Sequence, residues 1–132
     1  MKKFIYVFMM SILFLSCVET DKRLNGVFIN ETRYSTEEIE FKNNNLKINK
    51  KYSNEVTRSA NEEEFEYIYK IKIISKNDNG GTFYAIDDFY SDTEFNDTSK
   101  RKVIAYTFYG LELILEDNSK PERDRITRYT RK

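Results

Sequence analysis

A strict alternation of apolar and polar residues at positions 65–73 limits the possible folds of this chain more than any other feature. The odd positions are all apolar or aromatic: Phe65, Tyr67, Tyr69, Ile71 and Ile73. The even positions carry glutamate or lysine, except for Ile68. Side chains of a β-strand point alternately to its two faces, so this pattern predicts a strand with one buried face. A helix would mix the lysines among the aromatic residues.

Shorter segments with the same period extend this prediction along the chain. We expect further strands at residues 26–30, 38–42, 46–48, 82–86, 102–109, 111–115 and 125–131. Residues that favour turns separate several of them: three asparagines at positions 43–45, Asn79 with two glycines after it, and Gly110. We therefore expect an all-β fold, an antiparallel meander of about eight strands closed as a small barrel, with a β-sandwich as the alternative.

Two segments do not fit a strand. Residues 53–64 are mostly polar and predict a loop or a short exposed helix. Residues 87–101 form a long connection in which Phe89, Tyr90 and Phe95 stand among acidic and hydroxyl side chains. Long connections of this kind are often functional. One hypothesis is that these aromatic residues fold back as a lid over the barrel mouth; the other is that they anchor a protein partner.

The N-terminus has the organisation of an export signal. Lys2 and Lys3 precede the largely apolar residues 4–15. As a helix, this segment would be about 18 Å long at roughly 1.5 Å per residue, well short of the ~30 Å hydrocarbon core of a membrane. It is therefore interpreted as a signal peptide rather than a membrane span. Its last residues, Phe14-Leu15-Ser16-Cys17, resemble the lipobox of bacterial lipoproteins.

The lipobox resemblance implies a fate for Cys17. In that family the cysteine receives a diacylglycerol on its sulfur, becomes the mature N-terminus and can be acylated on its amine. Two or three acyl chains anchor a protein stably. The resemblance thus predicts a cleaved signal peptide (1–16), a lipidated tether (17–23) and a single β-rich domain (24–132). The domain would be anchored in the cell envelope, with the outer membrane or the cell surface favoured over the inner membrane.

A second resemblance concerns the two ends of the domain. Leu24-Asn25-Gly26-Val27-Phe28 and residues 126–131 are similar to the first and last strands of lipocalin-like barrels. That family begins its first strand with Gly-x-Trp and covers the indole with a basic residue from the last strand. Phe28 takes the place of the tryptophan here, and Arg128 is expected to stack on its ring. The resemblance implies a barrel that can hold a small apolar ligand.

Composition excludes several kinds of site. The chain has no histidine, and Cys17 is its single cysteine. This removes imidazole catalysis, thiol catalysis within the domain and the usual zinc sites. Without Lys2 and Lys3, the 22 basic and 22 acidic side chains of the whole chain become a formal charge of −2, which gives no reason to expect a nucleic-acid partner. We expect no enzyme activity, no cofactor and no bound metal.

The acidic groups of the long connection do not indicate a calcium site. Asp87, Asp88, Asp92, Glu94 and Asp97 lack the spacing of a calcium loop, and clustered carboxylates are usually solvated.

The aromatic residues leave two functions open. Tyr67, Tyr69 and Tyr106 would lie on inward faces of strands, either as core or as the lining of a ligand cavity. The first hypothesis is an interaction protein that binds a protein partner through residues 87–101 and exposed strand edges. The second is a binder of a small apolar ligand. An open apolar cavity of roughly 300 Å³ or more would favour the ligand. A barrel filled by its own side chains would favour the partner.

Overall fold

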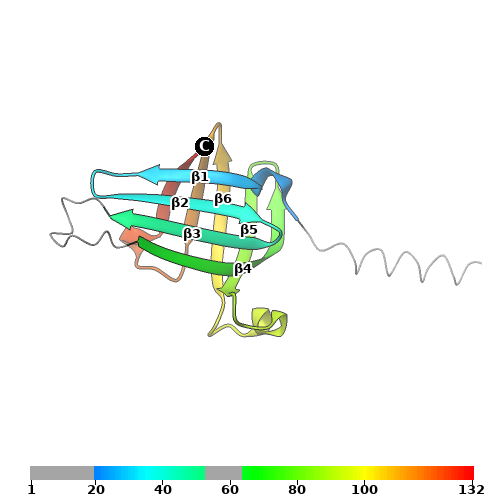
Figure 1. Ribbon diagram of the computed structural model, residues 1–132. Helices are drawn as coiled ribbons and strands as arrows, with labels where there is room; N and C mark the ends of the chain where they lie inside the picture. Colours follow the sequence, from blue (N-terminus) through cyan, green and yellow to red (C-terminus); the bar gives the residue numbers. More distant parts are fainter. Residues whose placement is uncertain (1–19, 53–63) are drawn as a thin grey trace, which may run out of the picture.

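The computed structural model describes residues 20–52 and 64–132 and shows a closed antiparallel barrel (Figure 1). Each strand pairs with the next one along the chain, and β8 pairs with β1. The strands are β1 (Gly26–Glu31), β2 (Ser35–Lys42), β3 (Asn45–Tyr52), β4 (Glu64–Asn77), β5 (Gly80–Asp87), β6 (Lys102–Tyr109), β7 (Glu112–Asp117) and β8 (Ile126–Arg131). The predicted all-β meander barrel is confirmed. The sandwich alternative is wrong, because the β1–β8 pairing closes the sheet.

The barrel is built of two crossing layers joined by β4. Figure 1 shows β1 to β4 across the front, with β5 and β6 running steeply behind them. β4 has 14 residues and belongs to both layers: its first half pairs with β3 and its second half with β5. The predicted strand at residues 65–73 is confirmed as the middle of β4. The predicted loop or helix at residues 53–64 lies outside the described residues, except Glu64, which begins β4.

The hairpin turns follow the chemistry of their residues. Asn43 and Asn44 have φ angles of 53° and 61°, the left-handed backbone that a two-residue type I′ hairpin needs at both positions. The predicted turn at residues 43–45 is thus confirmed. At the start of β5 the backbone passes very close to its neighbours. A Cβ on Gly81 would lie 2.6 Å from the Tyr106 Oη atom and closer still to the Ser75 carbonyl oxygen.

The interior of the barrel is filled by its own side chains. The rings of Phe28, Phe41 and Phe83 meet edge to face, with centroids about 6 Å apart. The largest fully buried side chains are Tyr106, Phe28, Phe83, Ile39, Leu46, Ile86 and Leu113. All but Ile86 belong to one continuous core cluster inside the barrel. Such filling is usual for a barrel of about eight strands.

The N-terminal segment closes one end of the barrel, called here the capped end. The 3₁₀ turn η1 (Lys22–Leu24) places Leu24 in the core, where it is 2% exposed. The Asp21 carboxylate accepts hydrogen bonds from the Arg23 guanidinium at 2.7 and 2.9 Å and from the Tyr106 hydroxyl at 2.7 Å. The hydrogen bonds from Arg23 hold the pKa of Asp21 at about 2, whereas burial and Asp21 raise the pKa of Tyr106. Within the described residues, Asp21 and Arg23 are therefore joined to the barrel by side-chain hydrogen bonds.

Arg23 connects η1 to the β4–β5 turn and to β6. Its guanidinium donates hydrogen bonds to the backbone carbonyls of Asn77 and Asp78, both at 2.9 Å, in the turn between β4 and β5. It also lies over the Phe108 ring, 5.1 Å from the centroid. One arginine thus links η1 to β4, β5 and β6.

The basic residue that covers Phe28 is Arg131, so the prediction of Arg128 is wrong. The Arg131 guanidinium lies 4.6 Å from the Phe28 ring centroid and donates a hydrogen bond to the Arg23 carbonyl at 2.7 Å. The reason is the register of the closing seam, which sets Phe28 opposite Arg131. Arg128 lies three residues away from that pair and points out of the barrel, with its guanidinium 3.7 Å from Glu112.

The connection after β5 lies against the outside of the barrel. It contains the 3₁₀ turn η2 (Asp92–Asn96), which contacts β5. Ile86 of β5 is 1% exposed yet lies outside the interior cluster, and Phe95 of η2 is 7% exposed. Alternation along β5 directs Ile86 outward, because Ala85 points inward. The hypothesis of a lid over the barrel mouth is therefore wrong for this segment. Phe95 packs on the outer wall instead.

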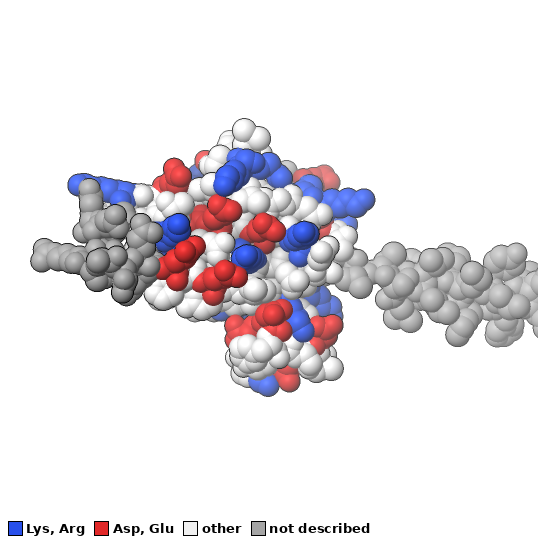
Figure 2. Space-filling model, in the orientation of Figure 1, with Lys and Arg blue, Asp and Glu red and all other residues white. Residues whose placement is uncertain are grey.

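The outer face of the first layer is polar and carries both signs of charge. Figure 2 shows lysine, arginine, aspartate and glutamate side chains interspersed over it. Strand register accounts for part of this mixing: Glu40 lies opposite Lys47, and Lys47 forms an ion pair with Glu66 at 3.6 Å. Among the described residues there is no helix long and apolar enough to cross a membrane.

Candidate functional site at the barrel mouth

The end of the barrel opposite η1, called here the mouth, is the candidate site. It lies where β2, β4, β6 and β8 begin, and it contains a hollow of about 200 Å³. Leu46, Ile48, Ala85 and Ile104 form an apolar floor. Charged and aromatic side chains form the wall and the rim: Glu37, Lys50, Tyr67, Tyr69, Lys102, Asp117 and Lys120. The hollow thus has an apolar floor and a charged rim.

Strand register brings these side chains together. Glu37 of β2 lies directly opposite Lys50 of β3, and Lys102 of β6 lies opposite Ala85 of β5. The four charged residues on strands each lie two positions beyond the last inward-facing apolar residue, so their side chains point toward the same side. They are Glu37, Lys50, Lys102 and Asp117. For example, Lys50 follows Leu46 and Ile48 at two-residue intervals. The mouth is therefore the place where the inward faces change from apolar to charged.

Glu37 is held by a buried tyrosine. The Tyr129 hydroxyl donates a hydrogen bond to Glu37 Oε1 at 2.7 Å, which links β8 to β2 past the intervening strand β1. Burial, followed by the negative charge of Glu37, raises the pKa of Tyr129, so its hydroxyl stays protonated as a donor. This bond fixes the position of one carboxylate at the mouth and leaves its second oxygen without a described partner.

Asp117 and Lys102 form the second polar pair. Asp117 accepts hydrogen bonds from the backbone N–H of Ser119 at 2.9 Å and from its hydroxyl at 2.6 Å. The Lys102 ammonium is 4.0 Å from the other Asp117 oxygen and 5.3 Å from the Tyr69 ring centroid. This lysine is thus oriented over the hollow by a carboxylate on one side and an aromatic face on the other.

Two further ammonium groups at the mouth have no carboxylate partner. Within residues 20–52 and 64–132, neither Lys50 nor Lys120 forms an ion pair, and the Lys50 ammonium lies 5.3 Å from the Tyr52 ring centroid. The mouth therefore offers free positive charge above an apolar floor. Chemically, it suits an anionic group attached to a short apolar or aromatic stem.

The structure divides the predicted site residues among three places. Tyr67 and Tyr69 lie at the mouth, and the Tyr67 ring is 53% exposed. Tyr106 lies near the capped end, where it is 1% exposed and bound to Asp21. Phe89, Tyr90 and Phe95 lie on the outer connection, and Phe89 is 79% exposed. Cys17 lies outside the described residues.

The acidic groups of the outer connection are largely engaged by lysines. Lys100 pairs with Glu94 at 2.9 Å, and Lys70 lies 3.5 Å from Asp92. Asp97 accepts hydrogen bonds from the hydroxyl and backbone N–H of Ser99, which lower its pKa. In the described part of the chain, no group of three or more potential metal ligands is clustered.

Sequence reasoning missed the charged residues of the mouth. Only Lys102 lies within a predicted strand, as its first residue, whereas Glu37, Lys50 and Asp117 lie just outside the predicted bounds. The signal was present in the alternation, since each has the same phase as the buried residues of its strand. Several charged residues in inward phase at the same end of a barrel indicate a polar opening rather than the end of a strand.

No protein-family model matches the chain, and no curated protein or solved structure is significantly similar to it.

Proposed function

We propose that this protein is a lipid-anchored lipoprotein of the bacterial cell envelope whose non-catalytic barrel binds an acidic segment of a partner protein at its mouth. The observation that carries the proposal is the unpaired positive charge of Lys50 and Lys120 above the apolar floor of a shallow hollow. Aspartate or glutamate side chains next to an apolar residue have the matching chemistry.

Filling of the barrel favours a protein partner over an enclosed apolar ligand. The hollow at the mouth measures about 200 Å³, below the roughly 300 Å³ at which small-molecule pockets begin. Its floor consists of core side chains that already occupy the interior. A side chain presented by another protein can use so shallow a site, because neighbouring contacts on the rim add to its binding energy.

The position of the anchor supports the same proposal. Cys17 precedes Asp21, which lies at the capped end, so acylation there would attach the membrane to the end opposite the mouth. The strands between the two ends have six to fourteen residues, which corresponds to about 20 Å or more at roughly 3.3 Å per residue. The mouth would then face away from the membrane, toward other envelope components.

Site-specific crosslinking tests the partner proposal. A photoreactive phenylalanine analogue in place of Tyr67 should form a discrete adduct with an envelope protein in intact cells. The matched control is the same replacement at Tyr109, a 74% exposed tyrosine at the capped end. Lys50→Gln with Lys120→Gln should abolish the adduct at position 67. Equal adducts at both positions, or an adduct unaffected by the lysine changes, would contradict recognition at the mouth.

Metabolic labelling tests the anchor separately. A fatty-acid analogue should label the wild-type protein, and Cys17→Ala should remove the label. Equal labelling of both proteins would refute the lipid anchor, whereas the crosslinking result would be unaffected.

A further inference from the structure

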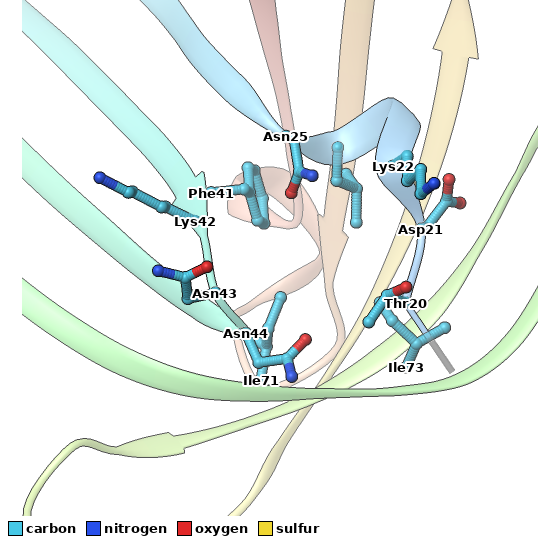
Figure 3. Close-up of a pocket in the computed structure, with 11 residues that line it drawn as sticks. Thr20, Asp21, Lys22, Asn25, Phe41, Lys42, Asn43, Asn44, Ile71 and Ile73 are labelled. Carbon is cyan, nitrogen blue, oxygen red and sulfur yellow. The ribbon is translucent and has the colours of Figure 1, made fainter. Parts of the chain in front are cut away.

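A second hollow, of about 360 Å³, lies at the capped end (Figure 3). Its inner wall is apolar and consists of Leu24, Phe41, Ile71 and Ile73. Its edge is polar and is formed by Thr20, Asp21, Lys22, Asn25, Lys42, Asn43 and Asn44. The hollow opens where β4 leaves β3 to pair with β5. The Ile71 N–H still donates a hydrogen bond to the Asn44 carbonyl oxygen at 2.8 Å, but no β3 residue pairs with β4 beyond Lys70.

The edge of this hollow carries uncompensated positive charge. Within the described residues, neither Lys22 nor Lys42 forms an ion pair or a side-chain hydrogen bond. The one carboxylate in the lining, Asp21, is already engaged by Arg23 and Tyr106. Figure 3 shows Thr20 and Asn25 approaching from the N-terminal segment and Asn44 from the facing hairpin, whereas the Lys42 ammonium points away along the surface. Lys22 therefore lies at the edge of the opening, the Lys42 ammonium lies farther out on the surface, and hydroxyl and amide groups line the hollow.

The capped end as a whole has an excess of positive charge. Its described turns and termini carry six basic side chains, Lys22, Arg23, Lys42, Lys76, Arg131 and Lys132, against four acidic ones, Asp21, Asp78, Glu112 and Glu38, the ion-pair partner of Lys132. An excess of lysine and arginine near an anionic membrane contributes attraction of about 1 kcal/mol per residue, within a screening distance of roughly 8 Å.

The short stretch of chain between Cys17 and Asp21 limits how far the capped end can lie from an acyl anchor on Cys17. Asp21 is four positions after Cys17, so a fully extended chain spans at most about 14 Å between them. If Cys17 is acylated, the capped end cannot leave the vicinity of the lipid headgroups. A hollow with an apolar wall, amide and hydroxyl groups and the Lys22 ammonium at its edge would then stand at the membrane surface.

We propose that the hollow beside Asp21 binds the headgroup of an anionic phospholipid of the anchoring membrane. The phosphodiester lies beside Lys22, the glycerol hydroxyls meet Asn25, Asn44 and Thr20, and the carbon backbone of the glycerol contacts the apolar wall. Lys42 adds positive charge at the outer edge. The inference rests on the proposed anchor for its orientation. It adds that the anchored domain is held in one fixed orientation, with the mouth directed away from the bilayer.

Vesicle flotation tests this binding without the anchor. The protein is the processed chain, residues 17–132, with Cys17→Ser, checked for the strand spectrum by circular dichroism. It should float with vesicles of equal parts phosphatidylglycerol and phosphatidylcholine and not with vesicles of pure phosphatidylcholine. Lys22→Gln with Lys42→Gln should weaken the partition constant about 25-fold, which corresponds to about 1 kcal/mol per lysine. The matched control, Lys51→Gln with Arg123→Gln at the mouth end, should leave it unchanged.

Amide chemical shifts separate the hollow from general surface attraction. A short-chain phosphatidylglycerol below its micelle concentration should shift the signals of Asn44 and Ile71 in a saturable manner. Inorganic phosphate at the same concentration should leave them unchanged; equal shifts would identify a free-anion site and overturn the lipid proposal. Failure to float, or equal losses in the lysine pair and its control, would also overturn it. Because this chain lacks Cys17, these outcomes are independent of the labelling result that tests the anchor.

Discussion

Removal of the Arg131 guanidinium should open the weakest pairing of the barrel. The described register joins β1 to β8 through only two residue pairs, Phe28 with Arg131 and Ile29 with Thr130. Arg131 strengthens this seam by covering the Phe28 ring and by donating hydrogen bonds to the carbonyls of Arg23 at 2.7 Å and Asn25 at 3.2 Å. A net hydrogen bond contributes about 0.5–1.5 kcal/mol and an exposed cation–π contact about 0.5–1 kcal/mol. Arg131→Ala should therefore lower the free energy of unfolding by about 2–3 kcal/mol.

Arg128→Ala is the matched control for this change. It removes the same side chain three residues earlier on the same strand, where the guanidinium is largely exposed and 3.7 Å from Glu112. Exposed ion pairs contribute about 0–1 kcal/mol, so this variant should differ little from wild type. Urea unfolding followed by circular dichroism measures both variants. The slope with denaturant should be unchanged if only stability is affected. Equal losses for the two variants would refute the role given to Arg131.

Three further predictions concern the cap, the close approach at β5 and the outer connection. The folded pKa of Asp21, about 2, lies below its ordinary value of 3.8, so its stabilisation is present above pH 4 and is lost as the pH falls toward 2. Asp21→Asn should accordingly cost about 2 kcal/mol at neutral pH in thermal or urea unfolding, and the difference from wild type should vanish near pH 2. Gly81→Ala should destabilise the domain by about 3 kcal/mol, because the added Cβ would clash with Tyr106 and Ser75. Gly110→Ala has open space around it but a φ of 61°, so it should cost only about 1–2 kcal/mol. Comparable urea midpoints for the two variants would contradict this account. Phe95→Ser should cost about 3 kcal/mol and Phe89→Ser less than about 0.5 kcal/mol, and a larger loss for Phe89 would mean that the exposed ring has a packing role.

The fold could be predicted because alternation and turn chemistry are local. Tyr69, Ile71 and Ile73 point inward as their phase predicts, and Asn43 and Asn44 form the turn that asparagine favours. These features depend on neighbours in sequence, so no knowledge of distant contacts is needed. Closure of the sheet is different, because strand number and hairpin spacing leave the β-sandwich open and only the distant β1–β8 pairing decides between the two folds.

The candidate site required contacts that sequence alone does not give. Arg128 and Arg131 are equally basic and lie on the same strand; only the register of β8 on β1 decides which of them covers Phe28. Tyr67 and Tyr106 are both inward tyrosines, yet one lies at an open mouth and the other beneath a cap that begins 85 residues earlier in the chain. Phe89 and Phe95 differ because Phe95 is buried in η2, which lies against β5, whereas Phe89 precedes that turn and is exposed.

The meander order of the strands also has a consequence for how the domain forms. Every neighbouring pair except one joins strands that are adjacent in the chain, so seven hairpins can assemble from local contacts. The β1–β8 seam alone requires the two ends of the domain to meet, and loop closure makes such a contact entropically costly. We expect the seam to form last in folding and to open first under native conditions. Hydrogen exchange should therefore be fastest at the seam amides of Lys132 and of β8, while the shared strand β4 exchanges most slowly.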